Sequence, residues 1–199
     1  MFSSSLFFST FVFALSFIGN CGARNVPNCL RPPRERRSET SLDLKDFAIS
    51  NVNAHTFVLN PSITIWNRTL SFLFTDLNSN TSTICTQSWT ETSASKDPTT
   101  NITIPMTNNA PSQYVLCDYT GIDPDCFQWR FVSSYTTFGT FEIGLAHTFR
   151  DDVNFEPPYD VPTFFATSVK LDLTCVDGNS CTLPACKSPL LATVDAVND

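Results

Sequence analysis

The stretch Phe127-Gln128-Trp129-Arg130-Phe131 decides the fold class of this chain. Large aromatic side chains occupy every second position, and polar side chains lie between them. Because successive side chains of a β-strand point to opposite faces of a sheet, this alternation predicts a strand with one buried face and one polar face. Residues 70–75 and 141–145 repeat the pattern. Together these segments predict antiparallel sheets that enclose one hydrophobic core.

Further strands are predicted from shorter apolar or alternating runs. These runs are at residues 42–47, 63–66, 84–89, 114–117, 169–175 and 192–197. Turn residues fill 76–80 and 121–125, whereas 91–101 and 150–162 read as longer surface loops. No stretch has the periodicity of an amphipathic helix. We therefore predict an all-β domain of about eight to nine strands, a compact antiparallel β-barrel or sandwich stapled by disulfides.

The beginning of the chain reads as two removable pieces. Leu6–Ile18 is apolar but shorter than the roughly 20 residues that span a bilayer, so it fits the core of a signal peptide, with cleavage after Ala23. The basic run that ends in Arg36 and Arg37 fits a proprotein-convertase site, although a disordered arm is the alternative reading. The predicted organisation is a signal peptide (1–23), a pro-segment or disordered arm (24–37) and a single secreted β domain (38–199).

The cysteines indicate an oxidising, extracellular destination. Both cuts together would remove Cys21 and Cys29 and leave an even number, which favours the second cut. The remaining six are expected to form three bridges: Cys85, Cys117, Cys126, Cys175, Cys181 and Cys186. Their residue spacing alone leaves the pairing open.

The net charge of −7 limits the partners. Nucleic acids and anionic membranes are bound through Lys and Arg, so neither is expected here. No later apolar run is long enough for a membrane span. Acidic, proline-containing loops would instead suit a basic or polar partner.

No catalytic set emerges. The chain has no Gly-x-Ser-x-Gly elbow, and its only histidines are His55 and His147. His147 is expected to be a surface or packing residue, and Glu142 to point to solvent. We predict no catalytic residue and no cofactor.

Acidic loop residues are candidate oxygen ligands for a cation. They are Asp123, Asp125, Asp151, Asp152, Glu156 and Asp160. Their spacing matches no EF-hand loop, and the histidines form no zinc motif. The favoured interpretation is that these carboxylates keep the protein soluble, so we predict no metal site.

Three sequons are candidate sites of N-glycosylation, at Asn67, Asn80 and Asn101. Asn80 and Asn101 fall in predicted loops, and Asn67 lies just before a predicted strand. Aromatic residues on neighbouring strands could line a ligand pocket, but the favoured reading is that they fill the core. They are Phe127, Trp129, Phe131, Phe138 and Phe141.

The order of several segments carries a family resemblance. These are residues 71–81 with Cys85 and Trp89, Tyr114 with Cys117, 127–131, 141–147, 157–160, Ala166, Cys175 and Cys181. This series resembles small secreted proteins of filamentous fungi that are similar to the Alternaria major-allergen β-barrel family. The resemblance implies an antiparallel barrel with bridges Cys85–Cys117 and Cys175 with Cys181 or Cys186. Cys126 is an addition to the common pattern.

The resemblance also implies secretion, allergenicity and interaction with plant hosts, with no established enzymatic activity. We therefore expect a secreted, non-enzymatic fungal β-barrel protein, effector-like or active in host or surface interaction, that binds a protein or glycan through loops 91–101 and 150–162. One alternative is a small-molecule carrier with an apolar cavity bounded by Trp129 and Phe141. A secreted hydrolase is the other, and it would require two inward carboxylates in a cleft.

Overall fold

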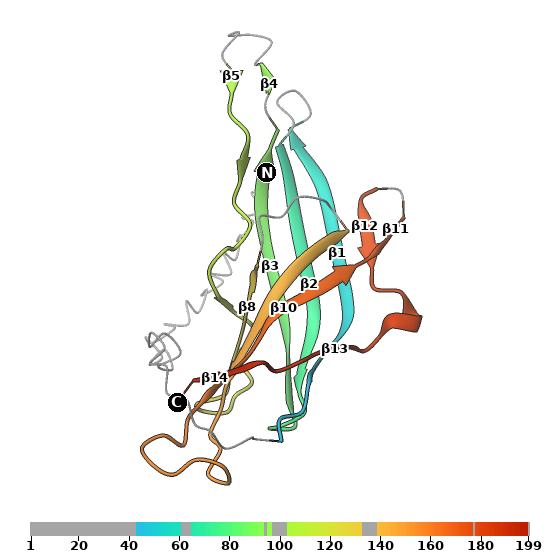
Figure 1. Ribbon diagram of the computed structural model, residues 1–199. Coiled ribbons are helices and arrows are strands. Elements are labelled where there is room, and N and C mark those ends of the chain that lie inside the picture. The colour runs from blue at the N-terminus through green and yellow to red at the C-terminus, as the bar shows by residue number, and fades with distance from the viewer. Residues whose placement is uncertain are drawn as a thin grey trace, which may run out of the picture.

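The computed structural model describes residues 43–60, 65–93, 95–96, 103–132, 139–176 and 178–198. Within these residues, fourteen strands form two main antiparallel sheets and a small two-stranded one. The main sheets stack on each other as in a sandwich, and each has edge strands, so they do not join into a closed barrel (Figure 1). The predicted all-β class is confirmed, in its sandwich form.

The first sheet is built on three long strands, β1 (Phe47–Asn60), β2 (Ile65–Asp76) and β3 (Thr81–Thr92). Shorter strands extend it: β6 (Thr107–Asn108), β11 (Thr174–Val176), β12 (Ser180–Thr182) and β13 (Leu190–Ala192). The order is β11-β12-β1-β2-β3-β6, and β13 also pairs with β1. The tight turn between β2 and β3 ends at Asn80, whose φ of 56° suits the left-handed tolerance of asparagine.

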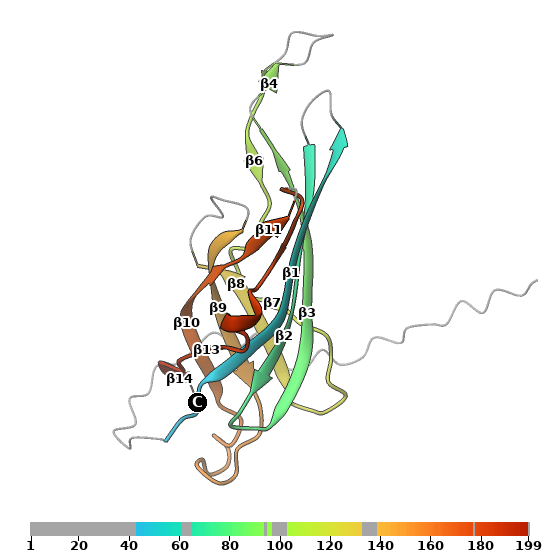
Figure 2. The same cartoon turned by 90° about the vertical axis from the view of Figure 1, so that its right-hand side faces the viewer.

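The second sheet has the order β14-β10-β9-β8-β7. Its strands are β7 (Val115–Leu116), β8 (Cys126–Phe131), β9 (Thr140–Thr148), β10 (Thr163–Asp172) and β14 (Ala196–Asn198). The small third sheet pairs β4 (Ser95–Lys96) with β5 (Thr103–Ile104), and a 3-10 helix spans Ala185–Lys187. Figure 2 shows the two main sheets from the side, with β1–β3 on one side of the core and β8–β10 on the other.

The predicted strands at 84–89, 127–131 and 141–145 are confirmed as parts of β3, β8 and β9. The other predicted bounds were less accurate, since the runs 169–175 and 192–197 are each divided between two strands and residues 43–46 precede β1. The strand expected near residue 47 continues to Asn60. Its full length was not predicted because a register shift at Asn51, with φ 53°, interrupts the alternation of side chains. The runs at 63–66 and 70–74 were expected separately, but residues 65–76 form one strand, β2. Part of the predicted loop 91–101 belongs to β3 and β4.

Aromatic side chains from both sheets fill the core. Trp129 is fully buried and meets Phe72 edge-to-face at 5.6 Å between ring centroids. Phe131 contacts Trp89 at 5.2 Å and Phe141 at 5.4 Å in the same manner. Offset edge contacts of this kind add to the stabilisation by burial. The prediction of a filled core is confirmed for these rings. Trp129 and Phe141, which were expected to bound a carrier cavity, both pack against Phe131.

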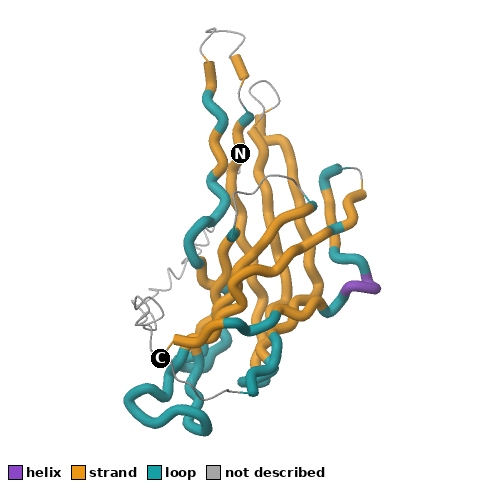
Figure 3. The backbone as a smooth tube through the Cα atoms, viewed as in Figure 1, coloured by secondary structure: helices purple, strands orange, loops and turns teal. Residues whose placement is uncertain are grey.

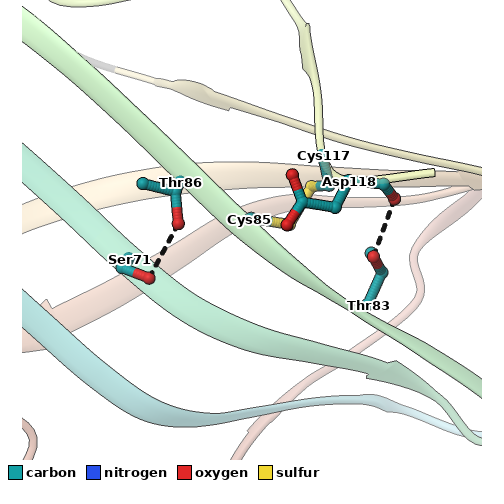
Figure 4. The surroundings of a disulfide bond; sticks show 6 residues. All are labelled: Ser71, Thr83, Cys85, Thr86, Cys117 and Asp118. Atoms are coloured by element: carbon teal, nitrogen blue, oxygen red, sulfur yellow. Dashed lines mark hydrogen bonds between the residues drawn. A yellow bond between two sulfur atoms is a disulfide. The ribbon is translucent and has the colours of Figure 1, made fainter. Parts of the chain in front are cut away.

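Two disulfides are formed within the described residues, Cys85–Cys117 and Cys175–Cys181. The first joins β3 to the chain beside β7 and so ties the two sheets together. Figure 4 shows it next to the hydrogen bond from the Thr83 hydroxyl to the Asp118 carbonyl, 2.7 Å. The second links directly paired residues of β11 and β12.

The expectation of three bridges among the six cysteines was wrong. Cys186 is exposed and free, because Cys181 lies opposite Cys175 and takes it as partner. Cys126 is disulfide-bonded, and its partner is not among the described residues. The even cysteine count therefore no longer supports the second cut, which stays a prediction. Ala23, Arg36, Arg37, Asn101 and Phe138 lie outside the described residues.

None of the described segments is a helix long and apolar enough to cross a membrane.

Candidate functional site

A buried cluster of three ionisable residues lies where the two sheets meet at one end of the sandwich. Asp76 is the last residue of β2, Asp125 ends the turn before β8, and His147 lies near the end of β9. Asp76 and His147 are fully buried, and Asp125 is 4% exposed. Charged groups are seldom buried unless they are paired, so the contacts within this cluster decide which of its groups are protonated.

The histidine bridges the two carboxylates. Its Nδ1 lies 2.7 Å from Oδ2 of Asp76, and its Nε2 lies 2.5 Å from Oδ1 of Asp125. Asp76 also accepts bonds from the backbone N–H and the side-chain amide of Asn78, at 2.7 and 2.8 Å. Both ring nitrogens can donate at the same time only in the imidazolium form, and the two flanking carboxylates favour that form.

Aromatic rings hold the imidazole in place. The ring of Phe127 stacks on it at 3.7 Å between centroids, and Phe149 stacks at 5.0 Å. Phe127 is the direct cross-strand partner of His147 in the β8–β9 pair, and Phe164 is its partner on β10. Sheet register therefore places the histidine, and the stacked rings exclude water from it.

The hydrogen bonds outweigh the cost of burial for this cluster. Burial alone would lower the pKa of His147, but its bonds to Asp125 and Asp76 and their negative charges raise that pKa above the ordinary 6.5. Burial would raise the pKa of Asp125, but its bond to His147 and the positive charge there bring it below 3.8. The folded state thus favours two carboxylates around one cation.

These pKa changes predict that the free energy of unfolding is highest over a plateau of pH and falls at both lower and higher pH. The contribution of His147 is complete below pH 6.5 and is lost as pH rises through its higher folded-state pKa. The contribution of Asp125 is complete above pH 3.8 and is lost as pH falls through its lower folded-state pKa. Each limb should change the free energy of unfolding by up to about 1.4 kcal/mol per pH unit. Urea unfolding measured between pH 2 and pH 9 checks this, and stability that is flat from pH 6.5 upward would contradict the alkaline limb.

A cleft of about 620 Å³ opens beside the cluster. We call it the end cleft. Phe164 of β10 and four segments line it: the chain before β1 (43–45), the β2–β3 turn (78, 79 and 81), the turn before β8 (122–125) and the loop after β9 (149–154). The loops gather at this end of the molecule in Figure 3. Asn78 fixes the first segment to the second, since it accepts from the backbone N–H of Lys45 and donates to its carbonyl.

The lining of the end cleft is mainly negative. Its carboxylates are Asp43, Asp123, Asp125, Asp151 and Asp152, and its cations are Lys45 and Arg150. Arg150 is already paired with Asp160. Asp125 has a second oxygen, Oδ2, that is buried without a hydrogen-bond partner. Because the cluster carries one more negative than positive charge, the cleft presents an attractive potential to cations.

The cluster is poorly suited to proton transfer. A general base needs a free nitrogen within reach of a substrate, and both nitrogens of His147 are bonded to carboxylates. A glycosidase acid needs a raised pKa, whereas that of Asp125 is lowered. The inward carboxylates Asp76 and Asp125 thus serve as hydrogen-bond partners of the histidine between them.

The other candidate residues are placed apart from this cluster. Asn80 lies in the exposed β2–β3 turn, and Asn67 is partly exposed on β2. The expectation that His147 is a surface residue was wrong, although its packing role was anticipated. In the part of the chain that the structure describes, no three His, Cys, Asp or Glu side chains could together hold a metal ion.

The chain was compared with known proteins in three ways. Family models, curated proteins and solved structures gave no match. The site must therefore be interpreted from its own geometry.

Proposed function

We propose that this protein acts outside the cell as a non-enzymatic recognition protein, effector-like or engaged with a host or surface component. The end cleft is its binding site, and the partner is a protein that presents a basic segment. The single observation that carries the proposal is the concentration of carboxylates around a cleft that lies beside the buried Asp76–His147–Asp125 cluster. The signal-peptide-like start and the disulfides support an extracellular location.

Rigidity favours recognition over chemistry here. Loops held by a stable scaffold commonly carry binding, and loop 150–162 borders the end cleft. Asp151 orders this loop by accepting bonds from the backbone N–H groups of Val153 and Asn154. A preordered loop loses less conformational entropy when a partner binds. The histidine that an enzyme would use, His147, is instead buried beneath the cleft with both nitrogens bonded to carboxylates.

The test uses a fluorescently labelled hexalysine peptide and the double variant Asp123→Asn/Asp152→Asn. Both residues are exposed, so the change should leave the core intact. Two exposed charge pairs contribute about 0.5 kcal/mol each, so the dissociation constant measured by anisotropy should rise about fivefold. Binding should also weaken with added salt.

The matched control is Asp118→Asn/Asp172→Asn, which removes the same charge from surface residues that lie neither in the cleft lining nor in loop 150–162. Its affinity should stay close to that of the unmodified protein. An equal loss in both double variants would show attraction by net charge alone and would contradict a binding site at the cleft.

A further inference from the structure

The outer face of the first sheet carries no charged side chain on its three long strands. Strand alternation directs Leu70, Phe72 and Phe74 into the core, so the intervening residues point outward. The outward positions that the register places together are Ala48, Ser50, Asn53, His55 and Phe57 on β1; Ile65, Asn67, Thr69, Ser71, Leu73 and Thr75 on β2; and Ser82, Ile84, Thr86, Ser88, Thr90 and Thr92 on β3. None is Asp, Glu, Lys or Arg, although these make up 16% of the chain.

Hydroxyl and amide groups form rows across this face. The register aligns Thr174, Thr182, Asn53, Ser71 and Thr86 from β11 to β3. A second row has Val176, Ser180, His55, Thr69 and Ser88. Neighbouring strands are about 4.8 Å apart, so the first row, and the second row beyond Val176, present regularly spaced polar groups. We call this surface the hydroxyl face.

The hydroxyls on this face retain bonding capacity. Thr69 and Ser88 share one hydrogen bond of 2.8 Å, and Ser71 and Thr86 share one of 2.9 Å (Figure 4). A hydroxyl has one donor and two acceptor positions, so each pair keeps a hydrogen and several lone pairs for a ligand. At one end of the face, Phe57 is 51% exposed and offers an apolar ring beside the polar rows.

We propose that the hydroxyl face docks an uncharged, extended polysaccharide. Such a polymer offers hydroxyls that match the rows and C–H surfaces that match an aromatic ring. The lack of charge means that no ion has to be desolvated without a partner on binding. A second copy of this chain is a poorer occupant, because homodimer interfaces are mainly apolar, whereas only five of the 17 outward residues are apolar: Ala48, Phe57, Ile65, Leu73 and Ile84. In Figure 2 the second sheet lies on the inner side of β1–β3, and no described strand covers the outer side.

The test is co-sedimentation of the full chain with insoluble β-1,3-glucan and with cellulose. All proteins carry Asn67→Gln, so that no glycan at this sequon can cover the face. The variant Thr86→Glu places a charge in the first row, and Thr193→Glu makes the same change at an exposed position outside the face. Thr86→Glu should weaken binding to at least one neutral polymer about tenfold, the equivalent of one good hydrogen bond, and Thr193→Glu should not.

A second variant removes hydroxyls without adding charge. Ser71→Ala/Thr86→Ala should also weaken binding, while its thermal unfolding shows that the fold is kept. The proposal is overturned if neither polymer sediments the protein, if both Glu variants bind alike, or if anionic polygalacturonate binds as well as the neutral polymers. Sedimentation equilibrium showing a dimer that Thr86→Glu dissociates would assign the face to a second copy instead.

Discussion

Replacing His147 by phenylalanine is expected to destabilise the protein by about 3–5 kcal/mol, the cost of removing one partner from a buried ion cluster. The substitution keeps an aromatic ring between Phe127 and Phe149 but removes both hydrogen bonds to the carboxylates. The substitution leaves Asp76 and Asp125 buried without the cation between them. Urea unfolding followed by tryptophan fluorescence measures the loss.

The chain contains its own control for this substitution. His55 lies exposed on β1, so His55→Phe makes the same chemical change outside the core. It should alter the free energy of unfolding by less than about 0.5 kcal/mol. Similar losses for the two variants would refute the buried cluster as a source of stability. Asp125→Asn in the His147→Phe background should recover part of the loss, since it removes one unpaired charge.

Removing the Cys85–Cys117 bridge is the second change with a large expected effect. It closes a loop with a sequence separation of 32, and the chain-entropy model gives about 4 kcal/mol for the double alanine variant. The Cys175–Cys181 loop has a separation of only 6, for which the same model gives about 2 kcal/mol. Guanidinium unfolding of both variants should therefore rank the first as the more damaging.

Cys186→Ala controls for the loss of a cysteine side chain, since Cys186 is exposed and forms no disulfide. Its unfolding midpoint should not move. A cost for the 175–181 variant equal to that of the 85–117 variant would contradict the loop-length argument. It would then point to local packing as the source of the stability from both bridges.

The regular strands were predictable because their side chains alternate without interruption. Residues 127–131 and 141–145 needed only the two-residue period, and β8 and β9 follow it. The long β1 was missed beyond its start, since its register shift near Asn51 moves the apolar positions out of phase. The short strands β4, β5 and β6 depend on contacts between distant segments, which no local pattern records.

Only part of the buried cluster could be predicted from the sequence. Continuing the inward series Phe141, Ile143 and Leu145 by two residues reaches His147, which predicts a buried histidine. The series that ends at Phe74 reaches Asp76 in the same way. Nothing in the sequence says that these two side chains meet, because that depends on how the sheets stack, or that the turn before β8 brings Asp125 to the other nitrogen.

The pairing of β12 and β13 with β1 determines when folding of the first sheet can be completed. Residues 180–192 supply the partners of residues 47–55, and residues 196–198 complete the edge of the other sheet. A chain growing from a ribosome therefore exposes the long strands before their last neighbours exist. Non-local pairing of this type folds slowly, on a scale of milliseconds to seconds. Completion of both sheets therefore waits for the synthesis of residues 180–198, and until then the side of β1 that pairs with β12 and β13 stays an open edge.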